Sequence, residues 1–195
     1  MTFTFNLITD HWIPCIRADG TRVELGLRET LAQAQVLREI RGDTPLETAA
    51  LHRLLLTVLH RVFGPRNATE WRKLWQRREH GFDMVALDAY LQQWQPRFDL
   101  FDPKQPFMQV RDPRVADKSL TSLVLHMASG NNGTLFDHHL DGFDITLSPA
   151  QAARALLASQ AFGIGGLSGL PEKFTDAPCA KGILFFAQGL SLIHI

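Results

Sequence analysis

An apolar stripe between Thr44 and Gly64 constrains the fold of this 195-residue chain more than any other feature of its sequence. Thr44 and Glu47 have the spacing of a capping box, and Pro45 stands at the first helical position, where no N–H donor is needed. Apolar residues then recur at helical spacing: Leu51, Leu54, Leu55, Val58, Leu59, Val62 and Phe63. The pattern predicts one long helix with a single apolar face, which must pack against a second layer.

Two shorter helix patterns follow this segment. Asn67 and Glu70 begin the first, which we expect to end near Gly81. Its apolar stripe consists of Trp71, Leu74 and Trp75. The second extends from residue 83 to the break at Pro96. Three consecutive helices with stripes predict a helical layer.

The residues before the long helix have the alternation typical of strands. Residues 3–8 alternate apolar and polar side chains, and residues 12–14 follow after a polar break, so we predict two short strands. Residues 18–21 have the composition of a hairpin turn and lead into a third extended segment, residues 22–25. We therefore predict an α+β fold, in which a small N-terminal β unit has one face covered by the helical layer.

The second half of the chain is less regular. Residues 97–114 are rich in Asp, Pro and Phe and predict irregular chain with a short extended piece at 107–110. A helix is expected over 119–127, followed by turn-forming residues 129–133 and a long polar segment. Ser148-Pro149 with Gln151 predicts a final helix over 149–162. Long loops in compact domains are usually functional, so the polar segment is a candidate site.

Composition excludes some classes of protein. Twenty basic and twenty acidic residues cancel, so any nucleic-acid contact must come from local patches or from partner subunits. Cys15 and Cys179 are isolated, and the N-terminus lacks a secretory pattern, which indicates a cytoplasmic protein. No apolar run approaches the roughly 20 residues of a membrane helix, so we expect no membrane partner.

A glycine run follows the last predicted helix, with Gly163, Gly165, Gly166 and Gly169 within seven residues. Its spacing fits neither G-x-G-x-x-G nor G-x-x-x-x-G-K-[ST], and a helix rather than a strand precedes it, which argues against a nucleotide cradle. A flexible connector or a backbone surface for a nucleic-acid groove remains.

Two polar clusters have competing interpretations. Asp137, His138, His139, Asp141 and Asp144 could hold a metal ion, but a solvated polar loop is favoured because further ligands of known spacing are missing. A basic group could follow a phosphate backbone beside the tryptophans of the stripe. Its members are Arg61, Arg66, Arg72, Lys73, Arg77 and Arg78. We favour instead a solvated helix face with Trp71 and Trp75 in the core.

Three segments in order resemble one family. They are NLITDHWIP at residues 6–14, QPFMQ at residues 105–109, and the final helix with its glycine run. Together they resemble CasA, the large subunit of the type I-E Cascade, an RNA-guided CRISPR surveillance complex. The resemblance extends to about residue 189. It implies a noncatalytic subunit without a cofactor, whose cleavage step belongs to a recruited helicase-nuclease.

The resemblance also implies positions for the contacts. The glycine run would approach the protospacer-adjacent motif of the target double-stranded DNA from the minor groove, with Gly163, Gly165, Gly166 and Gly169 as the DNA-binding positions. A groove about 6 Å wide admits bare backbone more easily than bulky side chains. The polar segment would meet the 5′ handle of the guide RNA and other Cascade subunits through Asn131, Asn132 and Phe136.

The chain departs from the family pattern in two respects. The family continues into further structure, so residues 1–190 are expected to form a truncated N-terminal domain, and residues 191–195 do not resemble the family's continuation. The polar segment is also acidic, which opposes contact with phosphate. A metal-dependent hydrolase that uses the Asp137–Asp144 cluster is the alternative function.

Overall fold

The computed structural model describes residues 3–110, 113–114, 119–127 and 145–163, and the backbone alone of 166–167 and 174–175. The elements follow in the order β1 (Ile13–Arg17), β2 (Arg22–Leu25), α1 (Leu27–Ala32), β3 (Leu37–Ile40), α2 (Pro45–Phe63), α3 (Ala68–Gln76), η1 (Arg78–His80), α4 (Met84–Trp94), η2 (Gln95–Phe98), η3 (Leu120–Leu123), α5 (Pro149–Phe162), β4 (Gly166–Leu167) and β5 (Phe174–Thr175). None of the helices in this described part is long and apolar enough to cross a membrane.

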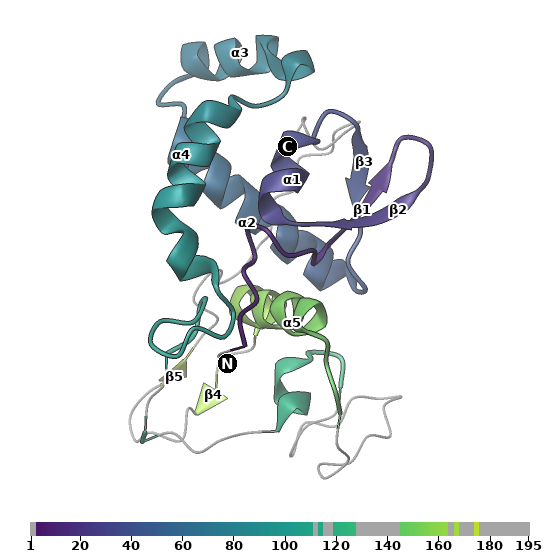
Figure 1. Cartoon of the computed structure of the whole chain (residues 1–195), viewed down its shortest axis with the longest axis vertical. Coiled ribbons are helices and arrows are strands. Elements are labelled where there is room, and N and C mark those ends of the chain that lie inside the picture. The colour runs from purple at the N-terminus through teal and green to yellow at the C-terminus, as the bar shows by residue number, and fades with distance from the viewer. Residues whose placement is uncertain are drawn as a thin grey trace.

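A three-stranded antiparallel sheet in the order β2-β1-β3 forms the N-terminal β unit (Figure 1). The predicted turn between β1 and β2 is confirmed: Gly20 has a φ of 87°, and the Thr21 N–H donates to Asp19 Oδ1 at 2.8 Å. α1 and β3 had not been predicted from the sequence. β3 has two charged residues between Leu37 and Ile40, so its strand character depends on pairing with β1 rather than on local alternation.

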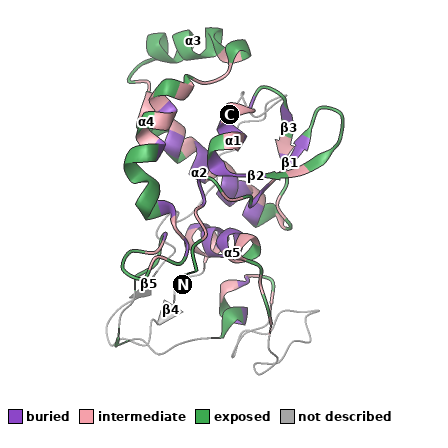
Figure 2. Cartoon of the chain, viewed as in Figure 1, coloured by how far each residue is buried: buried purple, intermediate pink, exposed green. Residues whose placement is uncertain are grey.

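The core lies between the sheet and the helices α1, α2, α4 and α5, as the buried faces in Figure 2 show. α2 begins as predicted, because the Glu47 N–H donates to Thr44 Oγ1 at 3.2 Å. The Glu47 carboxylate accepts from the Asp43 N–H at 2.9 Å, one residue before the position that the capping box predicts. α2 and α5 pack against each other and bury both apolar faces. The predicted α+β class is confirmed.

The strand predicted over residues 3–8 does not form; Asn6 makes one isolated antiparallel bridge with Asp99. The reason is local. The Asn6 side chain accepts the Ile8 N–H at 3.1 Å, and the Asp10 carboxylate accepts the Asn6 N–H. These bonds between side chains and backbone fold the segment into a turn, in competition with a strand ladder.

Two predictions in the second half are also wrong. Where a helix was expected over 119–127, a single 3₁₀ turn forms at Leu120–Leu123. The extended piece expected at 107–110 is a turn, in which Met108 has a φ of 52° and the Gln109 N–H donates to the Pro106 carbonyl at 3.2 Å. Pro106 favours this turn because its φ is already restricted.

α3 does not join the helical layer. It stands away from the sheet and from α5 in Figure 1 and has no buried residue. Trp71 is 47% exposed and Trp75 is 37% exposed, so the prediction that both tryptophans lie in the core is wrong. The helix does begin as expected, because Asn67 Oδ1 accepts the N–H groups of Thr69 and Glu70, each at 3.0 Å.

Candidate nucleic-acid interface

The glycine run starts where α5 ends. Gly163 closes the helix, since its N–H donates to the Ser159 carbonyl at 2.8 Å. A Cβ on Gly163 would lie 2.6 Å from that carbonyl oxygen, so the helix end by itself favours glycine here. Gly166 lies in β4, where it pairs with Thr175 of β5 in an antiparallel register. Gly165 and Gly169 lie outside the described residues.

α5 begins with a complete capping box. The Gln151 N–H donates to Ser148 Oγ at 3.3 Å, and the Gln151 side chain accepts the Ser148 N–H at 2.9 Å. Pro149 takes the first helical position, as predicted. The capping box and Pro149 therefore fix the start of α5, the helix that leads into the glycine run.

Arg154 anchors the middle of α5 to the N-terminal sheet. Its side chain is 5% exposed, and Nη1 donates to the Trp12 carbonyl at 2.9 Å. Three carboxylates surround the guanidinium: Glu24 at 3.2 Å, Asp43 at 3.0 Å and Glu47 at 3.7 Å. The cluster joins α5 to β2, to the segment after β3 and to the first turn of α2. Arg154 belongs to none of the motifs predicted from the sequence, although a cation within an alanine-rich helix is a usable signal.

A second contact holds the last turns of α5. Gln160 Nε2 donates to the Met108 carbonyl at 3.3 Å, which belongs to the QPFMQ segment. That segment is itself fixed: Phe107 is buried and stacks on Phe98 with ring centroids 5.3 Å apart, and Gln109 Nε2 donates to the Leu100 carbonyl at 3.0 Å. The helix is therefore held near its C-terminal end by residues about 50 positions earlier.

The NLITDHWIP segment is likewise fixed by a buried side chain and by hydrogen bonds. Trp12 has no exposed surface, and its Nε1 donates to the Leu7 carbonyl at 2.8 Å. The Leu7 N–H donates to the Phe98 carbonyl at 2.9 Å, which ties the segment to the residues beside QPFMQ. Both earlier segments that suggested a family thus contact α5, through the Trp12 and Met108 carbonyls, and together they position the start of the glycine run.

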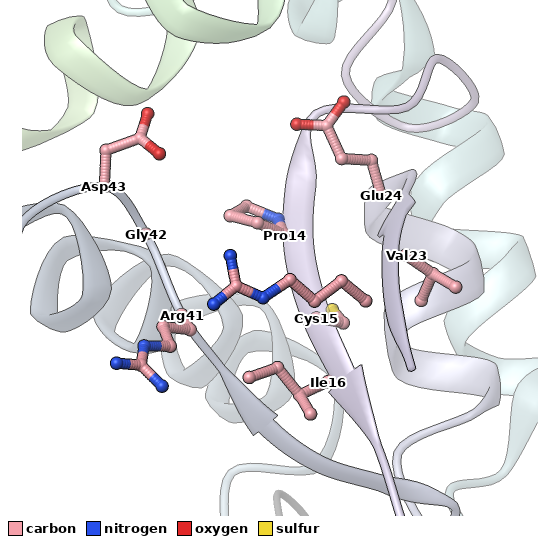
Figure 3. Close-up of a pocket in the computed structure, with 9 residues that line it drawn as sticks. Pro14, Cys15, Ile16, Val23, Glu24, Arg41, Gly42 and Asp43 are labelled. Carbon is pink, nitrogen blue, oxygen red and sulfur yellow. The ribbon is translucent and has the colours of Figure 1, made fainter. Parts of the chain in front are cut away.

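A pocket of about 420 Å³ lies on the sheet beside the Arg154 cluster. Figure 3 shows the Glu24 and Asp43 carboxylates near the same end of this pocket, on chain segments to either side of β1. Arg22 and Arg41 balance these two charges, so the lining has no net charge. Because both carboxylates bind Arg154, we interpret them as part of the anchor of α5 rather than as acid–base groups.

Cys15 borders the pocket and is buried, so we expect its thiol to react slowly. Burial raises the pKa of its thiol from 9.0 to about 11, although a hydrogen bond with Thr30 lowers it in part. In a Cys179→Ser background at pH 8, we expect Ellman's reagent to label native Cys15 at least about a hundredfold more slowly than in urea, since two pKa units reduce the thiolate a hundredfold. Equal labelling rates in the native protein and in urea would contradict this assignment.

The buried thiol also makes the free energy of unfolding depend on pH. Its stabilising contribution is complete below pH 9 and is lost as the pH rises toward 11.

The remaining predicted residues lie outside the described part of the chain. These are Asn131, Asn132, Phe136 and the Asp137–Asp144 cluster. Within the described ranges, no group of three or more His, Cys, Asp or Glu side chains could hold a metal ion. The guide-RNA contacts and the hydrolase alternative therefore stay predictions.

Residues 6–194 match the family described as CRISPR-associated protein Cse1. The chain is 43% identical over 195 residues to the CRISPR-associated protein CasA/Cse1 of Thermus thermophilus, an alignment that covers 97% of this chain and 38% of that relative. The crystal structure of Thermobifida fusca Cse1 is similar with a TM-score of 0.80 and 35% identity, over 97% of this chain and 38% of that one.

A further similar structure is described as a CRISPR RNA-guided surveillance complex. One of its chains matches with a TM-score of 0.70 and 28% identity, over 88% of this chain and 38% of that one. The α+β architecture is thus shared with solved Cse1 structures. The chain spans 38% of the length of each of these relatives.

Proposed function

This chain belongs to the CRISPR-associated Cse1 (CasA) family, and we propose that it helps an RNA-guided surveillance complex to recognise the protospacer-adjacent motif in double-stranded DNA. In this proposal, the glycine run meets the minor groove with its backbone. The subunit performs no chemistry and needs no cofactor. Cleavage belongs to a helicase-nuclease that the assembled complex recruits.

The way in which α5 is fixed is the observation that supports this proposal. Arg154 binds a carbonyl 142 residues earlier in the chain, and Gln160 binds one 52 residues earlier, so both the middle and the end of the helix are tied to the body of the protein. A surface that discriminates between base pairs must be held rigidly, because errors in position weaken the contacts. The glycine run begins directly after this anchored helix, at Gly163.

Glycine suits a minor-groove contact for a steric reason. The minor groove is about 6 Å wide, and a backbone without Cβ atoms can approach its floor where a side chain would strike the groove edge. Gly165, Gly166 and Gly169 are the proposed contact positions, with Gly163 as the residue that closes α5. We also propose that Asn131, Asn132 and Phe136 contact the 5′ handle of the guide RNA and neighbouring subunits.

Valine substitutions at Gly165 and Gly166 test this function. We expect each to reduce the preference for targets with the correct motif over targets without it by about tenfold, when the full-length protein is assembled into its complex. Valine is favoured in strands, so Gly166→Val preserves the extended backbone of β4 while adding bulk. The measurement is the ratio of the two target affinities at one fixed salt concentration.

A glycine far from α5 provides the control. Gly20 lies in the hairpin turn with a φ of 87°, and a Cβ there meets no atom within 4 Å. Asparagine tolerates this backbone conformation, so Gly20→Asn should leave target discrimination unchanged. Gel filtration of each assembled complex separates loss of recognition from loss of assembly. Full discrimination by both valine variants would reject the proposal.

A further inference from the structure

An apolar groove lies between the C-terminal half of α2 and the detached helix α3. Its volume is about 400 Å³, and Leu59, Phe63, Trp71, Leu74, Trp75 and Phe82 contribute most of its apolar lining. Leu59 and Phe63 belong to the α2 stripe but are only half-buried, whereas Leu51 and Leu55 earlier in that stripe are buried. The stripe therefore extends beyond the core and into this groove.

The apolar side of α3 is partly exposed. Trp71, Leu74 and Trp75 are 47%, 37% and 37% exposed. Trp71 and Trp75 pack edge to face with ring centroids 5.4 Å apart, and Phe63 stacks on Phe82 at 6.2 Å. Contiguous exposed apolar patches with ordered aromatic pairs are typical of surfaces that bind another molecule.

The groove lies in a strongly basic part of a neutral chain. Residues 60–83 contain five arginines and one lysine against three acidic residues, for a net charge of +3, while the whole chain has a net charge of zero. Arg77 and Arg78 line the groove directly. All six cations are exposed except Arg78, which is half-buried. A partner is therefore favoured if it offers apolar anchors flanked by negative charge.

We propose that this groove, the α2–α3 groove, binds an acidic amphipathic helix of a partner protein. Two helical walls with an apolar floor match the helix-in-groove mode, in which side chains at i, i+3, i+4 and i+7 serve as anchors. Aromatic residues and arginine are the types enriched at such protein interfaces. The proposal is independent of DNA recognition by the glycine run.

The groove geometry favours a protein partner over nucleic acid. Base stacking needs an open aromatic face, but the Arg78 guanidinium lies over the Trp75 ring at 4.8 Å from its centroid. Trp71 meets Trp75 at an interplanar angle of 79°, so the two rings do not form a flat platform. A second copy of the chain is also disfavoured, because a two-fold symmetric contact would bring two basic grooves together.

Calorimetric titration of the full chain with three synthetic helical peptides tests the proposal. The first has leucines at i, i+3, i+4 and i+7 with flanking glutamates, the second has the same composition scrambled, and the third has lysines in place of the glutamates. We expect saturable binding of the first peptide, at least about tenfold tighter than either of the others. The preference over the lysine peptide should decrease as salt is added.

Matched substitutions locate the binding site. Leu74→Glu should weaken binding of the acidic peptide by about tenfold or more, because it places a carboxylate among the groove's apolar side chains. Val85→Glu is the control: Val85 is 82% exposed on neighbouring α4 and does not line the groove. Arg77→Glu changes an exposed charge at the rim and provides a second variant that leaves the core intact. Circular dichroism checks that each variant is folded.

Four outcomes would overturn the proposal. They are absence of saturable peptide binding, equal binding of all three peptides, equal effects of Leu74→Glu and Val85→Glu, and displacement of the acidic peptide by a DNA or RNA oligonucleotide. Sedimentation analysis covers the case of self-association. A dimer of the parent chain that Leu74→Glu dissociates would assign the groove to a second copy instead.

Discussion

Replacing Trp12 with alanine is expected to lower the free energy of unfolding by about 4 kcal/mol, the usual cost of truncating a buried aromatic side chain. Trp12 has no exposed surface, and its indole N–H donates to the Leu7 carbonyl at 2.8 Å. The substitution leaves a cavity in the core and removes this bond. Urea denaturation followed by circular dichroism measures the change.

Two variants separate the contributions of packing and hydrogen bonding at Trp12. Trp12→Phe keeps most of the apolar contact and should cost only about 1–2 kcal/mol, because the Leu7 carbonyl still accepts the Leu27 N–H at 3.1 Å. Trp94→Ala serves as the control, since Trp94 is 40% exposed and its truncation should cost less than about 1 kcal/mol. Equal effects at the two tryptophans would contradict the central position of Trp12 in the core.

Arg154→Leu is expected to cost about 3 kcal/mol and to loosen α5 from the sheet. Breaking a buried ion pair leaves charge without compensation, which typically costs about 3–5 kcal/mol. Glu47 is 10% exposed and would bear most of this penalty, whereas Glu24 and Asp43 are 50% and 62% exposed and remain solvated. The lower end of the range is therefore expected. Urea denaturation gives the change in the free energy of unfolding. Faster hydrogen exchange of the α5 amides shows that the helix has loosened from the sheet.

An exposed arginine provides the comparison for Arg154. Arg28 forms a bidentate pair with Asp88 at 2.7 and 2.8 Å, with side chains 47% and 42% exposed, and Arg28→Leu should cost less than about 1 kcal/mol. The stability cost of Arg154→Lys should lie between those of Arg154→Leu and Arg28→Leu. An ammonium group cannot bind both the Trp12 carbonyl and Asp43 as the guanidinium does. If Arg154→Leu costs no more than Arg28→Leu, the anchor of α5 lies elsewhere.

Helix starts were the most predictable part of the fold. Thr44, Asn67 and Ser148 cap helices in the structure, as their spacing indicated, and Asp83, from which a helix was expected to extend, caps α4. Each cap involves groups within four residues of one another, so local sequence suffices to specify it. The resemblance to CasA is confirmed by the match of residues 6–194 to the Cse1 family.

The candidate site was only partly predictable. The sequence located the glycine run after a helix, and α5 ends at Phe162 as expected. It did not indicate that Arg154 and Gln160 fix that helix, because their partners lie 142 and 52 residues away. Bonds over such separations leave no periodic signature in one sequence. The three family segments were identified as separate patterns, whereas the contacts of residues 6–14 and 105–109 with α5 are a property of the folded chain.

The sequence by itself determined where α2, α3, α4 and α5 begin, that α3 is amphipathic, and that the chain is an α+β protein of a recognisable family. The tertiary structure decided which apolar stripes are buried. α2 and α3 both have such stripes, but only the first part of α2 meets the sheet and α5, while Trp71, Leu74 and Trp75 stay exposed. The tertiary structure likewise decided that residues 37–40 form a strand, through pairing with β1. Amphipathicity is a local property, whereas burial depends on what the rest of the chain places opposite that face.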